Sequence, residues 1–500
     1  MSTDPSITQA LQVYRSRWSS AQPGDRFRVD NPATGQPICE VQGAGPADVD
    51  AAVRAAHAAQ PRWAARPVAE RAAVLRAIAT ALRPQADALA LLETEENGKP
   101  LAQARHADME ACIGSFEFFA AQLLALETPS RTLGAITSSE ELVPYGVVAG
   151  ILPFNWPPIH FAAKVAPALA MGNAIVLKPG EQAPLTALRL AELVGAVLPD
   201  DVLQIVPGGA ATGQALVTHP LVRKLSFTGA PATGATVLAA IAARHVPALM
   251  ELGGKNALIV FDDADLDAAL AGALEGAFFN KGEACTAASR ILVQRPVYAQ
   301  FVERLARATR RLRVGDGRDP AVHVGPLVSR AQQQRVQGYL QLGQQEGARM
   351  AAQAALPSDP ALAQGFFVPP TVFADVTSAM RIAREEIFGP VTCVMPFDTE
   401  AQAIRISNDS DFGLLAAVYS RDDERTHRVA GQLEVGLVLI NNYNRQFMGT
   451  PFGGTKASGY GREHCAQTLR EFAYLRSRRQ PSGQGEPARW PVLHELLTPD

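Results

Sequence analysis

Hydrophobic and polar residues follow two different rhythms along this chain. From Asp48 to about Gln103, apolar residues recur every three or four positions, which predicts several amphipathic helices. From Val143 to Gly254, short β-branched runs alternate with helical segments, and a second region of this kind follows. Such alternation is typical of βαβ units around a parallel sheet. The predicted strands are Val147–Leu152, Ala174–Leu177, Val202–Val206, Lys224–Phe227, Ala257–Phe261, Ile291–Gln294, Val391–Phe397, Ala416–Tyr419 and Gly436–Ile440.

Two segments depart from this alternation. Residues Thr128 to Leu142 alternate weakly and predict an isolated β-ribbon, whereas the tail after Gln480 is rich in Pro and Gly and is expected to be irregular. Domains usually contain about 100 to 200 residues, so a chain of 500 residues predicts two or three of them. Two α/β units fit this length better than one.

Composition and charge exclude several classes of protein. A chain that is 47% hydrophobic and 19% charged is typical of a soluble globular protein and not of a disordered or fibrous one. The net charge of -3 provides no broad basic surface, so we expect no nucleic-acid partner. The chain has no apolar run long enough for a membrane span and no secretory signal pattern, so we expect no membrane partner.

The cysteines and histidines argue against disulfides and metal. The five cysteines are scattered, contain no CxxC pair and therefore predict a reducing cytoplasm. The histidines show no spacing typical of metal ligands, so we expect no metal site. Side chains of adjacent residues diverge, so His464 and Cys465 are interpreted as structural and not as a nucleophilic pair.

Three residues have the chemistry and the sequence context of catalytic groups. Cys285 follows a mostly apolar helical run and could be a nucleophile or a small buried apolar residue. Glu251 ends a strand-like run, where it could be a general base or a carboxylate that binds the turn. Asn155 follows a strand, at the sheet edge where ligands bind, and could stabilise an oxyanion or simply form a turn.

Two other segments favour a dinucleotide. Gly229 and Gly234 follow a strand and begin a helix whose amino terminus could face phosphate, although their spacing is not that of the usual glycine motif. Lys178 and Glu181 come at the end of the second strand of the unit, where they could bind ribose hydroxyls. A carboxylate at this place disfavours a 2′-phosphate, so NAD is expected over NADP.

Taken together and in this order, the motifs resemble those of the aldehyde dehydrogenase superfamily. The resemblance covers roughly residues 25 to 475, and seven motifs in one order are far more specific than any single motif. The motifs are Pro153-Phe154-Asn155-Trp156-Pro157, Lys178-Pro179-Gly180-Glu181, Phe227-Thr228-Gly229, Glu251-Leu252-Gly253-Gly254-Lys255, Cys285, Glu385-Glu386-Ile387-Phe388-Gly389-Pro390 and Pro451-Phe452-Gly453-Gly454.

The resemblance implies an α/β fold in three parts. These are a Rossmann-like NAD-binding domain (residues 1–125 and 145–253), an α/β catalytic domain (254–457) and a small β element with a tail (126–144 and 465–500) that builds a homodimer or homotetramer.

It also implies roles for residues in the oxidation of a small aldehyde to the acid. Cys285 would attack the aldehyde, Asn155 and the backbone N–H of Cys285 would hold the oxyanion, and Glu251 would activate the hydrolytic water. Lys164 and Glu463 would support Glu251. The implied cofactor residues are Lys178, Glu181, Phe227, Gly229, Gly234, Leu252, Glu386, Phe388 and Trp156.

Three positions depart from the family pattern. Ala230 replaces the usual Ser and removes a hydroxyl contact to the pyrophosphate, and Gly180 also replaces a Ser, which again favours NAD. Glu283 replaces the usual Gln before the nucleophile. An unpaired carboxylate there would raise the pKa of Cys285, although Lys281 could offset it.

The implied aldehyde tunnel leaves the substrate open. Small residues beside large aromatic ones favour a bulky or flat apolar aldehyde, whereas Arg445 could bind a carboxylate and select a semialdehyde. A coenzyme A acylating enzyme and a non-catalytic dinucleotide-binding scaffold are two further hypotheses, and the presence of Glu251 disfavours the first. The tunnel residues are Phe154, Trp156, His160, Ala163, Ala284, Arg445 and Phe452.

Overall fold

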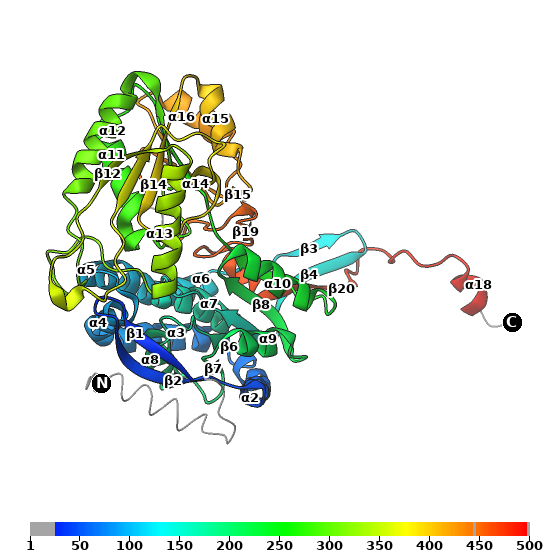
Figure 1. Cartoon of the computed structure of the whole chain (residues 1–500). Coiled ribbons are helices and arrows are strands. Elements are labelled where there is room, and N and C mark those ends of the chain that lie inside the picture. The colour runs from blue at the N-terminus through cyan, green and yellow to red at the C-terminus, as the bar shows by residue number, and fades with distance from the viewer. Residues whose placement is uncertain (1–25, 444–446, 498–500) are drawn as a thin grey trace.

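Two α/β lobes and one projecting ribbon make up the molecule (Figure 1). The computed structural model describes residues 26–443 and 447–497. One lobe contains most of the amino-terminal half of the chain, the other contains residues from about 257 to 440, and the ribbon extends away from the junction. Within the described residues, no helix is long and apolar enough to cross a membrane.

The first lobe is built on a six-stranded sheet with the order β19-β9-β8-β5-β6-β7. All of its neighbours are parallel except β19, which pairs antiparallel with β9. Its strands are β5 (Val147–Ile151), β6 (Ala174–Lys178), β7 (Leu203–Ile205), β8 (Val222–Thr228), β9 (Ala248–Glu251) and β19 (Gly459–Tyr460). The four strands predicted between Val143 and Gly254 are therefore confirmed, and the parallel order explains why they are buried on both faces.

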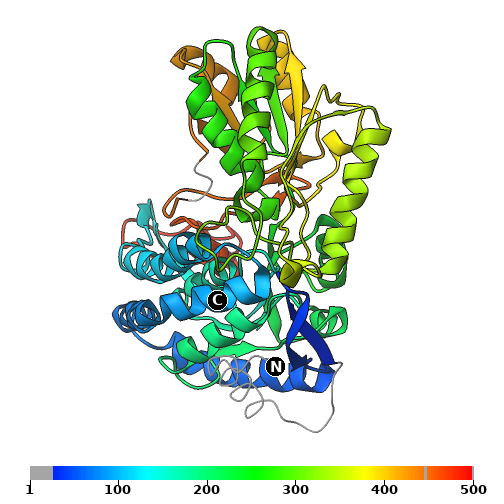
Figure 2. The same cartoon turned by 60° about the vertical axis from the view of Figure 1, so that its left-hand side comes forward.

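Helices cover both faces of this sheet, as Figure 2 shows from another side. Helix α7 is buried along its whole length, because it lies between the sheet and the outer helices α3 and α6. The helices of this lobe are α2 (Pro46–Ala64), α3 (Val68–Leu82), α4 (Ala86–Asn97), α6 (Glu110–Leu124), α7 (Pro157–Ala170), α8 (Leu185–Gly195), α9 (Ala210–Thr218) and α10 (Pro231–Ala242). A π-helical segment, η2 (Ala104–Met109), joins α5 (Leu101–Gln103) to α6.

The second lobe contains a seven-stranded sheet with the order β12-β13-β14-β11-β10-β16-β17. Only β12 pairs antiparallel within it. Its strands are β10 (Ala257–Val260), β11 (Arg290–Gln294), β12 (Arg349–Gln353), β13 (Thr371–Ala374), β14 (Val391–Phe397), β16 (Leu415–Tyr419) and β17 (Leu437–Ile440). The helices are α11 (Leu266–Phe278), α12 (Arg295–Arg310), α13 (Arg330–Gln345), α14 (Arg381–Arg384), α15 (Glu400–Asn408) and α16 (Asp423–Ala430). The five strands predicted here are confirmed, but β12 and β13 were not predicted.

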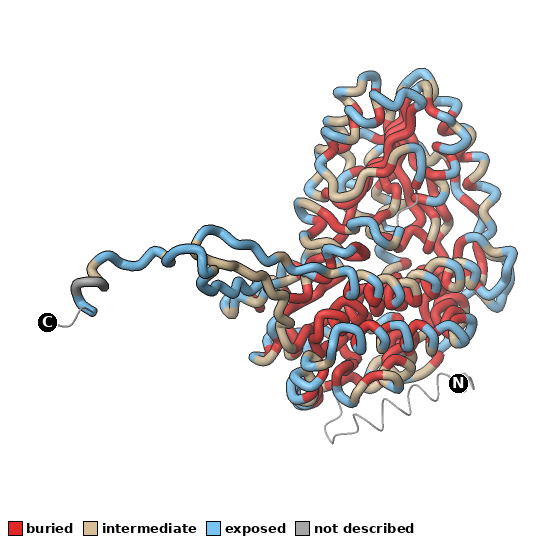
Figure 3. The backbone as a smooth tube through the Cα atoms, turned by 180° about the vertical axis from the view of Figure 1, so that it is seen from behind, coloured by how far each residue is buried: buried red, intermediate tan, exposed pale blue. Residues whose placement is uncertain are grey.

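The projecting ribbon is a three-stranded antiparallel sheet with the order β20-β4-β3. It combines the predicted ribbon, now β3 (Ser130–Leu133) and β4 (Ile136–Pro144), with β20 (Ala473–Pro481) from the far end of the chain. Figure 3 shows that its residues, apart from the buried Ala473 at the start of β20, are exposed or half-buried, unlike the two large sheets. The amino-terminal hairpin of β1 (Arg26–Asn31) and β2 (Gln36–Gln42) was also not predicted.

Candidate active site

The carboxyl ends of the parallel strands in the first sheet meet at one edge. Strand β5 leads into Phe154, β6 ends at Lys178, β8 at Thr228 and β9 at Glu251. Open α/β sheets bind ligands at this edge, because the loops and helix N-termini that follow the strands gather there. The structure therefore brings the separate motifs of the sequence to one place.

A cavity of about 390 Å³ follows this edge, and we call it the sheet-edge cavity. Four of the predicted cofactor residues line it, namely Lys178, Glu181, Phe227 and Gly229. The Nζ atom of Lys178 donates to the carbonyl of Pro179 at 2.9 Å and lies 3.6 Å from Oε2 of Glu181. Burial lowers the pKa of Lys178, because the loss of water around the ammonium outweighs the attraction of Glu181. A polar ligand in this cavity would replace part of the lost water.

The amino terminus of α10 also borders the sheet-edge cavity. Ala230 is the N-cap residue, and no side chain caps the helix. Free backbone N–H groups at such a terminus suit a phosphate. Gly234 lies one turn into α10 and has a different role: a Cβ atom there would lie 2.7 Å from Cδ2 of Leu252, so the glycine lets the helix pack closely.

A second cavity, the middle cavity, connects this edge to the thiol. Phe154, Asn155, Leu252, Glu386, Phe388 and Cys285 are among its lining residues. Oε1 of Glu386 accepts a hydrogen bond from the backbone N–H of Gly254 at 2.9 Å, and burial raises the pKa of Glu386 to about 7. A Cβ atom on Gly253 would lie 2.3 Å from Oε2 of Glu386, so only glycine leaves room for this carboxylate.

Phe388 is held in an uncommon backbone conformation. Its φ of 57° lies in the left-handed region, which costs free energy for a residue other than glycine. Gln332 donates to its carbonyl at 2.6 Å, and its ring packs edge-on against Phe154 at 5.8 Å between centroids. The two rings therefore form a rigid aromatic corner of the middle cavity.

A tight loop between α11 and β11 carries the thiol. Asn280, Lys281 and Gly282 have φ values of 48°, 61° and 69°, so three successive residues adopt left-handed backbone. The side-chain amide of Asn280 donates to the carbonyls of Asn155 and Glu283, at 3.0 Å each. Nδ2 of Asn155 donates to the same Glu283 carbonyl at 3.1 Å, so the loop and the Asn155 amide are held together.

Glu283, the departure from the family pattern, points into the protein. Its side chain and that of Lys281 are completely buried, with 3.0 Å between Nζ and Oε2. Oε1 of Glu283 also accepts the backbone N–H of Val328 at 3.2 Å, and Lys281 donates to the carbonyl of Asn97 at 2.8 Å. The predicted compensation by Lys281 is therefore present, although burial still raises the pKa of Glu283.

Cys285 lies where two cavities meet. Its half-buried side chain lines both the middle cavity and a third cavity of about 380 Å³, which we call the inner cavity. Asn256 donates to the Cys285 carbonyl at 2.8 Å, which fixes the backbone behind the thiol. A molecule in the inner cavity and a molecule in the middle cavity would both reach this sulfur.

Glu251 lies in a buried charged group with Lys164 and Glu463. Lys164 donates to Ser226 at 3.1 Å, to Thr228 at 2.8 Å and to Glu463 at 3.1 Å. Neither carboxylate oxygen of Glu251 has a hydrogen-bond partner among the described residues. Burial, and then the nearby Glu463, raise the pKa of Glu251 well above its ordinary value. Such a carboxyl is suited to proton transfer near neutral pH.

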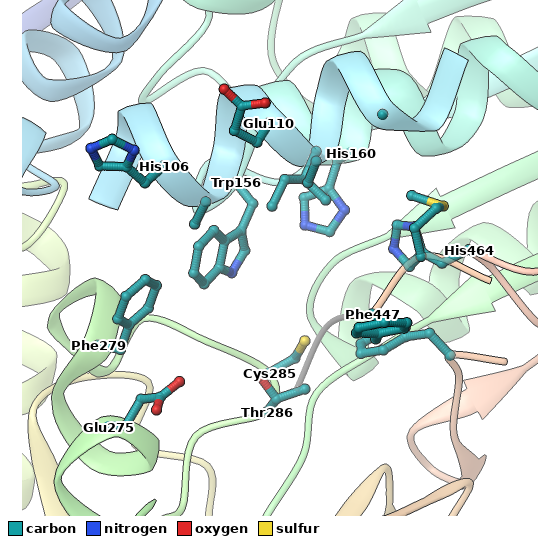
Figure 4. Close-up of a pocket in the computed structure, with 16 residues that line it drawn as sticks. His106, Glu110, Trp156, His160, Glu275, Phe279, Cys285, Thr286, Phe447 and His464 are labelled. Atoms are coloured by element: carbon teal, nitrogen blue, oxygen red, sulfur yellow. The ribbon is translucent and has the colours of Figure 1, made fainter. Parts of the chain in front are cut away.

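Aromatic side chains form the walls of the inner cavity (Figure 4). Trp156 and Phe279 stack at 5.8 Å between centroids with 17° between their planes, and Lys99 lies 4.2 Å from the Trp156 ring centre. Phe452, His160 and His464 line the cavity as well, with Phe447 beside the thiol. Within residues 26–443 and 447–497, no group of three His, Cys, Asp or Glu side chains could hold a metal ion.

Sequence comparisons identify relatives along almost the whole chain. The model of the aldehyde dehydrogenase family matches residues 18–477. The aldehyde dehydrogenase citD of Monascus ruber is 48% identical and covers 97% of both chains. A betaine aldehyde dehydrogenase of Mesorhizobium japonicum is 43% identical, over 94% of this chain and 96% of its own.

Solved structures agree with this result. The NAD⁺ complex of an aldehyde dehydrogenase from Bacillus cereus is 35% identical, with a TM-score of 0.90 over 96% of this chain and 99% of its own. Betaine aldehyde dehydrogenase from Staphylococcus aureus, also with NAD⁺, is 32% identical, with a TM-score of 0.89 over 96% of this chain and 98% of its own.

The chain belongs to the aldehyde dehydrogenase family. The predicted fold and the predicted enzyme class, an aldehyde dehydrogenase that uses NAD, are thereby confirmed.

Some tunnel residues of this aldehyde dehydrogenase lie elsewhere than expected. Phe154 lines the middle cavity and not the inner one, whereas Trp156, predicted both as a tunnel residue and as a cofactor residue, lines the inner cavity. Ala284 packs against Trp156 and Ile159 in a small buried cluster and lines neither cavity beside Cys285. Arg445 lies outside the described residues.

Other site residues of the enzyme were not found from the sequence. Gln332 and Arg335, which hold the backbone around Phe388, come from α13, and His464 lines the inner cavity although it was interpreted as structural. Cys465 faces Thr468 instead, so the two adjacent side chains do diverge. No sequence motif marks these residues, because they reach the site only through packing.

We predict strong coupling between Lys281 and Glu283. Lys281→Met leaves a buried carboxylate without its cation, and the free energy of unfolding should fall by about 3 to 5 kcal/mol. Lys281→Met combined with Glu283→Gln should lose less than the sum of the two single variants, which denaturant unfolding in a double-mutant cycle measures. The exposed pair Arg428 and Glu400, treated in the same way, should show almost no coupling. Additive effects at positions 281 and 283 would contradict this prediction.

We also predict that Glu386 makes stability depend on pH. Its pKa is about 7 in the folded protein, above the ordinary 4.5. Between these two pH values the folded state binds more protons than the unfolded state. The free energy of unfolding therefore falls as pH rises from about 4.5 through 7. Glu386→Gln removes this loss, and the Tm difference between the variant and the wild type should increase from pH 5 to pH 8.

The neighbouring Glu385 provides the control, because Arg381 lowers its pKa. Glu385→Gln should give a Tm difference that stays constant over the same pH range. A constant difference for Glu386→Gln as well would show that the carboxyl ionises normally.

Proposed function

We propose that this enzyme oxidises its aldehyde through a thioester on Cys285, which is then hydrolysed to the carboxylic acid. The observation that carries this proposal is the position of Cys285 between the inner cavity and the middle cavity. We assign the inner cavity to the aldehyde. The middle and sheet-edge cavities fit a dinucleotide, since they contain an aromatic corner, two carboxylates and an uncapped helix N-terminus.

Oxidation would begin when the Cys285 thiolate bonds to the aldehyde carbon. The second N–H of the Asn155 amide and the backbone N–H of Cys285 would stabilise the oxygen that gains the negative charge. The Asn155 amide is already oriented by the Glu283 carbonyl, so little reorganisation is needed. Bound NAD would supply the oxidant, because its nicotinamide accepts the hydride. The carbon is then a thioester of Cys285.

Hydrolysis would use Glu251. Its carboxylate would take a proton from water as the hydroxide bonds to the thioester carbon, and the Cys285 thiolate would leave with the acid as product. In the structure, Glu251 lies toward Gly453, where an added Cβ atom would be only 2.7 Å from Oε1 of Glu251, and it lines neither cavity beside the thiol. We therefore propose that the side chain turns toward Cys285 in the hydrolytic step, which its lack of hydrogen bonds permits.

The cavities support the cofactor contacts that the sequence predicted. Lys178 and Glu181 would bind the adenine-side ribose, and Glu386 the nicotinamide-side ribose, with Phe388 near the nicotinamide. Glu181 would repel a 2′-phosphate, which favours NAD over NADP. Gly180 is also explained by packing, since a Cβ atom there would lie 3.0 Å from the Phe154 backbone nitrogen.

The hydrolytic reaction has more support than the coenzyme A acylating reaction or the semialdehyde specificity. Relatives named betaine aldehyde dehydrogenase favour a hydrolytic enzyme, and so does the buried Glu251 group, which a coenzyme A acylating enzyme would not need. A semialdehyde specificity through Arg445 stays a prediction from the sequence.

We further propose that the chain forms a homodimer or homotetramer through the β3-β4-β20 ribbon, and that it works in the cytoplasm. Among the described residues β20 is an edge strand of the ribbon, and Leu133, Tyr474 and Leu475 are exposed on it. Exposed apolar side chains on a projecting sheet favour association with another copy.

We also propose the division into domains that the sequence predicted. Residues 126–144 and 465–500 form the bridging element, residues 1–125 and 145–253 form the NAD domain, and residues 254–457 form the catalytic domain.

We predict that Glu251→Gln separates oxidation from hydrolysis. The variant should release about one NADH per subunit in a rapid burst and then turn over at least about a hundredfold more slowly, because the thioester accumulates. Stopped-flow absorbance of NADH measures both phases. Cys285→Ala should show no burst, although it should still bind NAD. A burst in Cys285→Ala, or normal steady turnover in Glu251→Gln, would refute the assigned roles.

We predict that Leu475→Glu weakens the assembly. A charge on this exposed apolar position should shift the mass measured by light scattering toward a smaller species. Leu356→Glu, at an exposed apolar position outside the ribbon, is the matched control and should leave the mass unchanged. An unchanged mass for Leu475→Glu would exclude this face of the ribbon as the assembly surface.

A further inference from the structure

Glu251 and Arg462 meet at one glycine. A Cβ atom added to Gly453 would lie 2.7 Å from Oε1 of Glu251 and 3.1 Å from Nη1 of Arg462. The same point lies 2.6 Å from the carbonyl oxygen of Gly461. The carboxylate and the guanidinium therefore border the same small space, and glycine at position 453 leaves room for both.

The guanidinium of Arg462 is fixed by the backbone. Its Nη1 atom donates to the carbonyl of Gly454 at 3.0 Å and to that of Gly461 at 2.6 Å. The segment between these two glycines contains β19, in which Gly459 lies opposite Glu251 of β9. The strand that carries the carboxylate is thus paired with the segment that holds the cation. Since backbone carbonyls have no net charge, they leave the positive charge of the guanidinium in place.

The ammonium of Lys164, on α7, is the other cation near Glu251, and its donors are already used. An ammonium has three N–H groups. Lys164 directs them to Ser226, Thr228 and Glu463. No donor remains for Glu251, and neither of its carboxylate oxygens has a hydrogen-bond partner among the described residues.

The other titratable groups around Glu251 do not supply positive charge. Glu463 and Glu471 are the neighbouring carboxyl groups, and both act against its ionisation. The ammonium of Lys224 lies 3.5 Å from Glu471 and compensates it in part. Burial lowers the pKa of the His464 ring, so this ring adds no charge near neutral pH.

A carboxyl group must be ionised before it can take a proton from water. Burial, and then Glu463, raise the pKa of Glu251, whereas Lys164 and Arg462 lower it. Because Lys164 is bound to Glu463, Arg462 is the cation that no neighbouring carboxylate shares by a hydrogen bond in this group. Arg462 lines none of the three cavities, so it acts on the reaction only through other residues.

We propose that Arg462 is a positioning residue for the hydrolytic step: held beside Gly453, its guanidinium keeps Glu251 in the ionised form that accepts a proton from water. The proposal rests on the proposed function, in which Glu251 is the general base. It predicts that Arg462 affects hydrolysis of the thioester and not its formation.

The ester p-nitrophenyl acetate separates these two steps without NAD. The Cys285 thiolate bonds to the acetyl carbon and p-nitrophenolate leaves, which forms a thioester on the same sulfur. Water then gives a proton to Glu251 and bonds to the acetyl carbon, and the carbon–sulfur bond breaks to release acetic acid and the thiolate. Absorbance of p-nitrophenolate measures acetylation. Intact-protein mass spectrometry, after removal of the excess ester, measures loss of the acetyl group.

Arg462→Met should leave the acetylation rate within about twofold of wild type and slow the hydrolysis about tenfold at pH 7. The rising limb of the hydrolysis rate should move up by about one pH unit, because a smaller fraction of Glu251 is ionised at each pH. Arg462→Lys keeps the charge and should recover most of the hydrolysis rate. Arg470→Met, at an exposed arginine of the same stretch, is the matched control and should change neither rate.

Two further variants separate charge from packing. Arg462→Gln keeps N–H donors for the two carbonyls but has no charge, so it should slow hydrolysis as Arg462→Met does. Arg462→Met combined with Glu463→Gln also removes a neighbouring negative charge. The double variant should therefore hydrolyse faster than Arg462→Met, with its pH profile moved back toward wild type. A residue that only holds the loop would show neither effect. The melting temperature of each variant verifies its fold.

The results distinguish this proposal from the one on which it rests. Hydrolysis with the wild-type rate and pH profile in Arg462→Gln, or no recovery in either Arg462→Lys or the double variant, would overturn the role of Arg462 alone. Normal loss of the acetyl group in Glu251→Gln would instead overturn the assignment of Glu251 as the base.

Discussion

Hydrogen bonds to a single carbonyl, that of Glu283, hold the thiol loop against the first lobe, and the geometry of the site depends on them. Asn155 comes from the loop after β5 and Asn280 from the loop after α11, and both donate to this oxygen. Because the two lobes contribute one donor each, the thiol loop is positioned relative to the Asn155 amide across the lobe boundary. The left-handed backbone at residues 280–282 is the conformational cost of that approach.

Buried charge surrounds this loop on its inner side. Lys281 pairs with Glu283, and Lys99 contacts Glu93 and Asp108 in a group with no solvent exposure. Buried ion pairs are costly to desolvate and contribute little net stability, but breaking one of them is strongly destabilising. We interpret these groups as positioning devices: the Lys99 ammonium is set over the Trp156 ring, and the π-helical η2 brings Asp108 to it.

The site separates charged chemistry from substrate recognition. Lys164, Glu251 and Glu463 share a buried group behind the thiol, where low polarity shifts the carboxyl of Glu251 toward the neutral form. The inner cavity on the other side is lined mainly by aromatic rings and imidazoles, with the carboxylates of Glu110 and Glu275 also among its lining residues.

The sequence alone determined the elements and the motifs. Nine strands and the family were predictable, because strand periodicity and the order of the motifs are local properties of the chain, and the catalytic roles of Cys285, Glu251 and Asn155 stay a prediction. Tertiary structure decided where the side chains point. Phe154 lines the middle cavity and Trp156 the inner one, Ala284 belongs to a buried cluster, Glu283 pairs with Lys281, and His464 lines the inner cavity. These outcomes depend on backbone angles and on contacts between residues far apart in the chain, and no local pattern of residue types encodes either.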